Sequence, residues 1–447
     1  MNKITLLCFL ALSLCTSHAN AAVTLLDKDE WKISMGGFVE LDSIVDSTRS
    51  FTEVEGNSAV SRDSVAGQTG RTQFSIRNTR LAFSVEPPEF ESWKTKGYFE
   101  FDLLGFDPAP GTTNTEAAFF NNPSFRVRHT YLSAEREGWQ ILGGQYWNML
   151  GWQPYYFMPT VQVAPITGML YGRTGQIRVT KTVTMDNNNT MQAALGIMRP
   201  PQRDASLPGL EGGMRIAFGN RTAGFAGGST APQKNQPLSF GLSGAVREFV
   251  TPQSPLAPTG DLTHVLGYAG VADALIPVIA SSDGKDPSNT LVFGGEFTTG
   301  KGYGDQLVGY TGGLGSPLNS IATAPEKNMN LDAGIGGFDS SGNFQLVDLR
   351  TFNAYFQYHL PGTCRTWFSG GYGRLYSDNI NTMVGATGKT SAGNFPYDKV
   401  QTYFANWMHD VTKQIRVGFE YAFSRTEYGD AYVAHNNRYQ LSAFFIF

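Results

Sequence analysis

Charged residues at alternate positions mark where this chain could bind a solute. Arg126 and Arg128 lie two residues apart, as do Glu100 and Asp102, and residues with that spacing share one face of a β-strand. A guanidinium group presents a planar fork of N–H donors that fits a carboxylate or a phosphate, and rings of charge select the ions that enter a pore. The candidate pore-lining residues are Arg80, Arg126, Arg128, Arg178, Arg215, Glu100 and Asp102.

A second interpretation of the same residues is structural. Arginines and carboxylates on neighbouring strands also pair with one another across a sheet, and exposed pairs of this kind contribute little energy. The spacing fits both interpretations, so the sequence leaves open whether these arginines are free to meet a solute.

The residues that enzymes and metal sites need show no comparable pattern. The histidines lack the spacing of metal ligands, there is no Gly-x-Ser-x-Gly elbow, and Met383 replaces the first glycine of a phosphate-binding loop before Gly388-Lys389-Thr390. The formal net charge of -4 gives no footprint for nucleic acid. The sequence therefore predicts no enzyme, no cofactor, no metal site and no nucleic-acid partner.

The end of the chain indicates which elements would position the charged residues. Apolar side chains occupy every second position there, and a tilted strand of about ten such residues can cross a bilayer. A terminal strand faces lipid only if it pairs with the first strand of a closed barrel; the alternative is the buried last strand of a soluble sandwich. The expected membrane-insertion signal is Tyr439, Leu441, Phe445 and Phe447.

Alternating segments recur along the chain, joined by connections that are long and short in turn. They predict an all-β fold, a transmembrane antiparallel β-barrel of about 16 strands with short periplasmic turns and long extracellular loops. The connections 220–237 and 271–289 are too long for periplasmic turns, and 301–343 would be the longest outer loop. The expected strands lie near 31–45, 73–86, 94–105, 125–135, 138–149, 173–185, 190–198, 211–219, 238–250, 262–270, 290–299, 344–360, 363–377, 399–409, 414–426 and 437–447.

The first residues predict export from the cytoplasm. A charged start, an apolar run from Ile4 to Leu14 and small residues before Ala22 form the layout of a secretory signal peptide. The expected organisation is a signal peptide over 1–21, a short periplasmic segment over 22–30 and the barrel over 31–447.

Three motifs carry a family resemblance: Gly36-Gly37-Phe38-Val39-Glu40-Leu41-Asp42, Arg77-Asn78-Thr79-Arg80-Leu81, and Arg126-Val127-Arg128-His129-Thr130-Tyr131-Leu132 running into Gly144-Gln145-Tyr146-Trp147. In these the chain resembles the DcaP-like porins of Gram-negative bacteria, distant relatives of the phosphate-selective porins. The resemblance implies a homotrimer of sixteen-stranded barrels that passes small hydrophilic solutes, with a preference for anions such as dicarboxylates. It also implies that Arg80, Arg126 and Arg128 face the lumen. The periplasmic coiled-coil extension that such proteins can carry has no counterpart here.

The segment 150–172 is rich in aromatic residues and proline and is too apolar to lie comfortably in water. The third outer loop of a porin commonly narrows the channel, and this segment is third in the expected order. Packing on a neighbouring subunit is the alternative. The expected constriction residues are Trp152, Tyr155, Tyr156 and Phe157.

The leading functional hypothesis is a porin of the bacterial outer membrane for passive diffusion of small anionic, dicarboxylate-like solutes. Its expected partners are outer-membrane lipid, the barrel-assembly machinery, small anionic solutes and two further copies of the chain. The alternative is a barrel that acts as an adhesin or surface receptor through its outer loops, which predicts a plugged lumen.

Overall fold

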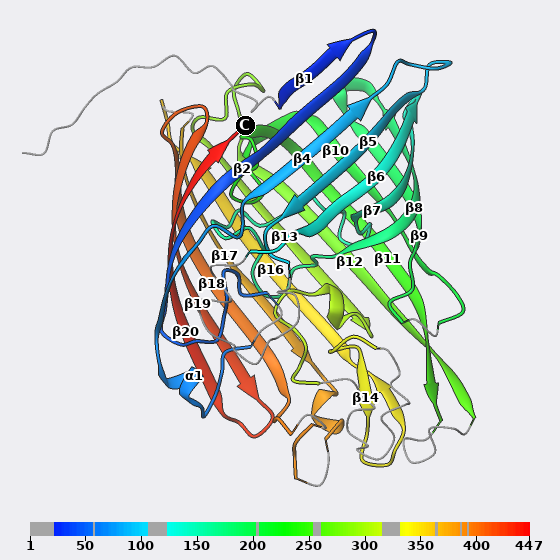
Figure 1. Ribbon diagram of the computed structural model, residues 1–447, viewed down its shortest axis with the longest axis vertical. Coiled ribbons are helices and arrows are strands. Elements are labelled where there is room, and N and C mark those ends of the chain that lie inside the picture. Colours follow the sequence, from blue (N-terminus) through cyan, green and yellow to red (C-terminus); the bar gives the residue numbers. More distant parts are fainter. Residues whose placement is uncertain are drawn as a thin grey trace, which may run out of the picture.

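One antiparallel sheet closes on itself. The computed structural model describes residues 22–56, 59–105, 123–202, 205–253, 261–314, 331–362, 365–384, 387–390 and 393–447. The sheet has 18 strands, of which β3 and β4 share one position in the wall and β1 lies outside the ring, so sixteen positions remain. The ring closes where β20 (Val433–Ile446) pairs with β2 (Trp31–Asp46) (Figure 1). The predicted barrel of about 16 strands is confirmed.

Neighbouring wall positions follow one another in the chain, so the connections are hairpins. The remaining wall strands are β3 (Arg71–Ser75), β4 (Arg80–Glu86), β5 (Lys94–Asp102), β6 (Arg126–Arg136), β7 (Trp139–Trp147), β8 (Arg173–Thr184), β9 (Thr190–Met198), β10 (Gly209–Phe225), β11 (Lys234–Pro252), β12 (Leu262–Ile279), β13 (Thr290–Lys301), β16 (Asp348–His359), β17 (Thr366–Ser377), β18 (Tyr397–Asp410) and β19 (Ile415–Tyr428). Outside the wall lie β1 (Val23–Lys28), α1 (Val65–Gln68), the hairpin of β14 (Gly336–Phe338) and β15 (Phe344–Leu346), and the short 3-10 helices η1 (Asp186–Asn188), η2 (Gly304–Gln306) and η5 (Ile380–Thr382). Across the described ranges, every helix is too short or too polar to span a membrane.

Short turns gather at one end of the barrel and long loops at the other. β1 and the C-terminus mark the turn end, and α1 and β14 mark the loop end (Figure 1). This is the predicted arrangement of periplasmic turns and extracellular loops. Three of the outer loops are L1 (47–70), L3 (148–172) and L6 (302–347).

The strand predicted near 73–86 is interrupted at 76–79. There the Thr79 hydroxyl accepts a hydrogen bond from the backbone N–H of Glu40 at 3.1 Å, and Asn78 Nδ2 donates to Asp42 Oδ2 at 2.7 Å. These side chains occupy places that ladder bonds would fill. β2 therefore pairs with β3 on one side of the gap and with β4 on the other.

β10 and β12 run further than the sequence predicted. The ranges 220–237 and 271–289 read as long turns, but β10 continues to Phe225 and β12 to Ile279, each through an irregularity in the register. Such bulges break the alternation on which a sequence reading depends. The connections that remain, 226–233 and 280–289, contain no strand.

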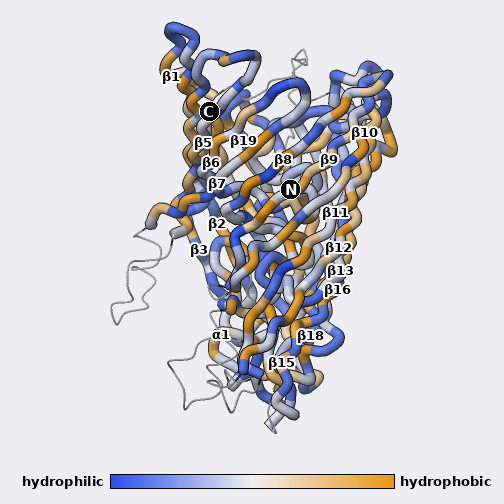
Figure 2. The backbone as a smooth tube through the Cα atoms, turned by 90° about the vertical axis from the view of Figure 1, so that its right-hand side faces the viewer, coloured by the Kyte–Doolittle hydropathy of each residue, from blue (hydrophilic) through white to orange (hydrophobic). Residues whose placement is uncertain are grey.

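The N-terminal segment is a strand in the structure. β1 pairs with the start of β2 and projects with it beyond the end of the barrel (Figures 1 and 2). The expected periplasmic segment over 22–30 thus extends one edge of the sheet away from the wall. The expected signal peptide lies outside the described residues.

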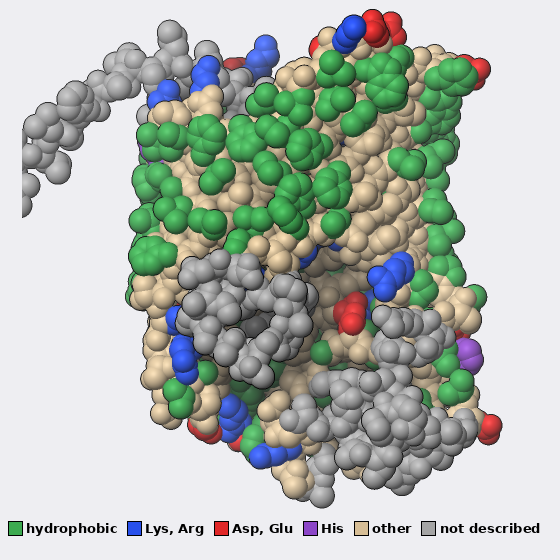
Figure 3. All heavy atoms as spheres, viewed as in Figure 1, with side chains coloured by type: hydrophobic (Ala, Val, Ile, Leu, Met, Phe, Trp, Pro, Cys, Tyr) green, Lys and Arg blue, Asp and Glu red, His purple; other side chains and the backbone are tan. Residues whose placement is uncertain are grey.

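The outward face of the wall is an apolar belt. Figure 3 shows it as a band of hydrophobic side chains over β2 and the strands beside it, and Figure 2 shows hydropathy alternating along the strands. An apolar outer face next to a polar lumen is typical of an outer-membrane barrel. Exposed members include Val39, Leu41, Phe99, Leu132, Ile177, Leu195, Leu242, Leu266, Phe293, Phe352, Phe419, Tyr439, Leu441 and Phe445.

Candidate functional site in the lumen

Loop L3 lies inside the barrel, where carboxylates of the wall hold its backbone. Glu211 Oε2 accepts hydrogen bonds from the N–H groups of Met149 and Leu150 at 2.9 and 3.0 Å. The peptide groups of an irregular buried loop need such partners, so L3 is fixed as an inner wall of the lumen. The two other contacts of this kind join Leu170 N to Glu296 Oε1 (3.1 Å) and Val161 N to Glu420 Oε2 (2.7 Å).

The four aromatic residues expected to narrow the channel face different surroundings. Trp152 and Tyr156 are buried and hydrogen-bond to β11 at 3.1 and 3.2 Å, so they anchor the loop. Phe157 packs edge-on against Trp147, with ring centroids 4.8 Å apart. Tyr155 is 39% exposed, and among the four it presents the most surface to open space.

The structure brings three of the predicted arginines together with both predicted carboxylates. Arg126 binds Asp102 with two N–H groups at 3.0 and 2.6 Å. Arg128, 1% exposed, donates to Glu100 at 2.6 Å and to Asp102 at 3.1 Å. Arg80 Nε stands 3.7 Å from Glu100 Oε1. The structural interpretation therefore describes Arg126 and Arg128 well and Arg80 only in part.

Arg173 completes this group, and Tyr171 lies against it. The alternation of residues in the sequence identified neither. The Arg173 guanidinium lies 4.9 Å from the ring centroid of Trp147 and 5.3 Å from that of Tyr171. We call the whole group the basic cluster, in which four guanidinium groups meet two carboxylates. Its members are Arg80, Arg126, Arg128, Arg173, Glu100 and Asp102.

The positive excess of the basic cluster acts on Tyr171, which lies in L3. Burial would raise the pKa of its hydroxyl, but the charges of Arg128, Arg173 and Arg80 outweigh burial and lower the pKa to about 7. Arg128 Nη2 lies 3.5 Å from the Tyr171 oxygen. The local potential is therefore strongly positive.

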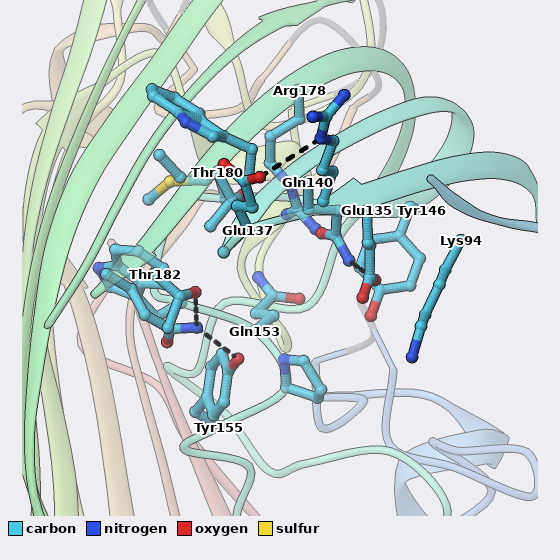
Figure 4. A pocket seen from close by; sticks show the side chains of 18 of the residues that line it. Lys94, Glu135, Glu137, Gln140, Tyr146, Gln153, Tyr155, Arg178, Thr180 and Thr182 are labelled. Carbon is cyan, nitrogen blue, oxygen red and sulfur yellow. Dashed lines mark hydrogen bonds and ion pairs between the residues drawn. The ribbon is translucent and has the colours of Figure 1, made fainter. Parts of the chain in front are cut away.

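The two remaining predicted arginines border a different space. A cavity of about 500 Å³ opens between the periplasmic turns and L3, and we call it the periplasmic vestibule (Figure 4). Arg178 lines it and stacks on Tyr146 at 5.0 Å. Arg215, 6% exposed, lies behind the lining, where it stacks on Tyr155 at 4.1 Å and donates to Gln192 at 3.3 Å. Within the part of the chain that the structure describes, no carboxylate lies within ion-pairing distance of Arg178 or Arg215.

Neutral hydrogen-bonding groups complete the periplasmic vestibule. Gln192 Nε2 donates to Thr182 Oγ1 at 3.2 Å and to Tyr155 Oη at 3.4 Å, while Gln140 donates to Glu135 at 2.6 Å (Figure 4). Lys94 adds a further positive charge at the rim. The carboxylates of Glu135 and Glu137 also line the vestibule, so its lining combines both signs of charge with amides and hydroxyls.

A second cavity, of about 300 Å³, opens on the loop side of L3, and we call it the extracellular vestibule. Arg173, Arg199 and Arg247 line it together with Asp305 and Asp332. Arg247 is paired with Asp305, whereas Arg173 has the aromatic contacts described above. Both signs of charge therefore meet a solute at this entrance.

A thin partition of L3 separates the two vestibules. Asn148 and Gly172 border the extracellular side, Met149 and Gln153 the periplasmic side, and Gly172 N donates to Gln153 Oε1 at 3.2 Å. Both polar atoms of the Asn148 side chain are buried without a hydrogen-bond partner among the described residues, as are Gln306 Oε1 and Arg178 Nε. Buried polar atoms of this kind normally have a partner such as water, so the partition presents unsatisfied polar atoms at the border of the two vestibules.

Groups of three or more metal-ligating side chains do not occur among the residues described. The absence of a metal site and of a cofactor therefore remains a prediction.

The barrel is similar in fold to solved structures of outer-membrane channels. The fold is similar to the outer membrane channel DcaP of Acinetobacter baumannii, with a TM-score of 0.62 and 16% identity over 94% of this chain and 99% of that chain. The predicted resemblance to DcaP-like porins is thus confirmed at the level of the fold, as is the predicted outer-membrane barrel.

Two further structures show the same fold at lower similarity. The anion-selective porin from Comamonas acidovorans matches with a TM-score of 0.52 and 10% identity, over 94% of this chain and 100% of that chain. OmpT of Vibrio cholerae in its trimer form matches with a TM-score of 0.51 and 11% identity, over 93% and 99% of the two chains. No family model and no curated protein matches the sequence.

Proposed function

We propose that this protein is an outer-membrane porin for passive diffusion of small hydrophilic anions, dicarboxylates among them. The observation that carries the proposal is Arg178, which lines the periplasmic vestibule without a carboxylate within ion-pairing distance among the described residues, with Arg215 buried directly behind the lining residues Tyr155 and Gln192. An arginine that is not neutralised attracts an anion from water and offers it a bidentate contact. The similarity in fold to an anion-selective porin agrees with this assignment.

The proposed route runs along the wall formed by β7, β8 and β9. A solute enters the extracellular vestibule near Arg173, passes the partition at Asn148 and leaves past Arg178 and Tyr155. The unpartnered polar atoms at the partition replace part of the hydration that the solute loses there.

We further propose that the protein assembles as a trimer. β5, β6 and β7 have only 9 to 11 residues, whereas β11 has 19, so the wall is low on one side. A low wall is best covered by another copy of the barrel, and the similar OmpT has a trimer form. The apolar belt supports lipid as the neighbour elsewhere, and the C-terminal strand with Tyr439, Leu441, Phe445 and Phe447 is the proposed signal for the barrel-assembly machinery.

One observation favours the receptor alternative. L1, L3 and L6 all pack into the lumen, and their buried residues form shared clusters, including Phe51, Leu150 and Tyr310. A lumen filled by loops fits a barrel that binds a partner at its surface and does not conduct.

Single-channel recording of the refolded protein in a planar bilayer with a salt gradient separates the two functions. The porin predicts stepwise openings in threes and a reversal potential shifted toward that of the anion. Insertion without conductance would exclude the porin and favour the receptor. Openings with a reversal potential shifted toward that of the cation would support the porin function and exclude the preference for anions.

A further inference from the structure

A third cavity in the lumen, of about 70 Å³, adjoins the extracellular vestibule at Tyr171, which lines both, but does not lie between the two vestibules. Its lining combines the basic cluster, through Arg80 and Arg128, with the aromatic residues Trp147 and Phe157 and with the periplasmic turn Gly227 to Thr230. Two guanidinium groups line this cavity and no carboxylate does. Its size suits one small ion with few waters, and not a dicarboxylate in transit.

The turn 226–233 is folded into the barrel instead of lying at its rim. It joins β10 to β11 but binds the opposite wall, where Arg416 Nη1 donates to the carbonyl oxygens of Ser229 and Ala231 at 2.8 and 2.9 Å. At its start, Ala226 N donates to Gln357 Oε1 at 2.8 Å. The turn is therefore fixed at both ends, and the position of its side chains relative to the cavity is fixed with it.

Two polar groups that line the cavity have unused hydrogen-bonding capacity. Among the described residues, the hydroxyl of Ser229, 2% exposed, makes no hydrogen bond, and neither does Arg80 Nε, whose ion-pair partner Glu100 Oε1 lies 3.7 Å away. Buried donors of this kind normally have a partner, because leaving them unpaired is costly. Beside them, Gly228 has φ +87, and a Cβ on it would meet no atom within 4 Å, so the turn leaves open space here.

We propose that this cavity holds a resident inorganic oxyanion of the size of sulfate or phosphate. Arg80 and Arg128 bind it from β4 and β6, and the Ser229 hydroxyl donates to it from the turn. The anion neutralises part of the positive excess of the basic cluster and links the periplasmic turn to the wall. The site is independent of the proposed transport of anions, because it is not on the route between the two vestibules.

The site can be tested by titrating sodium sulfate into the purified protein in detergent, by calorimetry at constant ionic strength set with gluconate, which is too large for the cavity. One saturable site per chain is expected. Arg80→Gln should abolish it, and Ser229→Ala should weaken it about tenfold, the effect of one hydrogen bond to a charged group. Arg350→Gln is the matched control, because Arg350 pairs with Asp378 on the outer surface, and it should bind like the unchanged protein.

Crystals soaked in sodium selenate give the location. An anomalous peak between Arg80, Arg128 and Ser229 supports the proposal, and a peak only in the vestibules, or none, overturns it. Equal sulfate affinity in the unchanged protein and in Ser229→Ala would overturn it as well, and Ser229→Ala removes only a hydroxyl, so failure to fold does not obscure this result. Anion-selective conductance in a protein without the calorimetric site would reject the resident anion and leave the proposed function intact.

Discussion

The basic cluster and the periplasmic vestibule both present arginines to the lumen, but their surroundings differ. In the basic cluster, Arg126 and Arg128 hold Asp102 and Glu100 in close ion pairs. At the periplasmic vestibule, Arg178 in the lining and Arg215 behind it stack on tyrosines, and no described carboxylate pairs with them. The comparison teaches that an inward arginine is a candidate for solute binding only where its charge is not already neutralised. In the proposed function, Arg126 and Arg128 maintain the wall, and Arg178 faces the solute.

The largest expected effect is the loss of stability in Arg128→Ala. Removing one partner of a buried ion pair leaves a carboxylate uncompensated and costs about 3–5 kcal/mol, and Arg128 serves both Glu100 and Asp102. Arg178→Ala breaks no ion pair and should cost less than about 1 kcal/mol. Urea unfolding of the protein in micelles, followed by tryptophan fluorescence, measures both. Equal losses in the two variants would remove the distinction between the two regions.

The next effect concerns the loop that separates the two regions. Glu211→Ala leaves the N–H groups of Met149 and Leu150 without their acceptor, at a cost of about 1–3 kcal/mol for each. L3 should then move, and single-channel records should show frequent brief closures. Glu211→Gln keeps an acceptor oxygen at the same place, so its single-channel records should show fewer brief closures than those of Glu211→Ala. Identical records for both variants would show that these bonds do not hold the loop.

A smaller effect is expected on ion selectivity. A charge about 4 Å from an ion in water is worth about 1 kcal/mol, so the removal of Arg178, which lines the periplasmic vestibule, should lower the ratio of anion to cation permeability roughly fivefold. The removal of Arg215, which is buried behind the lining, should lower this ratio less. The double variant with alanine at both positions tests this through the reversal potential in a salt gradient. Arg350→Ala, on the outer surface, should leave the reversal potential unchanged. A shift that follows Arg126→Ala more than the double variant would assign selectivity to the basic cluster instead.

The smallest effect is a dependence of selectivity on pH. The pKa of Tyr171 is about 7, so its hydroxyl is neutral below that pH and negative above it. Anion preference should therefore decrease as the pH rises from 6 to 8, because a negative charge appears at the extracellular vestibule. Tyr171→Phe removes the titrating group, and its reversal potential should not change over this interval. A pH response that persists in Tyr171→Phe would exclude Tyr171 as its source.

The sequence predicted the wall of the barrel better than its contents. Alternation with a period of two is a local property, so the strands and the inward positions of Arg80, Arg126 and Arg128 could be read directly. Irregularities in the pairing of strands could not be predicted from the sequence. A shift of register between Glu100 and Phe101, opposite His129 and Val127, turns both Arg128 and His129 inward, and strict alternation permits only one of them.

The lumen depends on contacts between residues that are far apart in the chain. Glu211, Glu296 and Glu420 accept from L3 across separations of up to 259 residues, and no local pattern marks them. Arg173 stands where L3 ends and β8 begins, where the facing of a side chain is not set by alternation. The partners of Arg128, Glu100 and Asp102, lie on the neighbouring strand β5, and the sequence offered this pairing as one of two interpretations. The spacing alone did not decide between the two interpretations, so the sequence could not separate Arg128 from Arg178.

The inward course of the turn 226–233 has a consequence for how this channel can evolve. The turn begins and ends in two strands that are already paired with each other, so residues can be inserted or deleted within it without shifting the register of any strand in the wall. Substitutions in the strands, in contrast, must preserve pairing on both sides. The open cross-section of the lumen can therefore vary between related chains through changes in the length of one periplasmic turn, while the barrel that surrounds it stays the same.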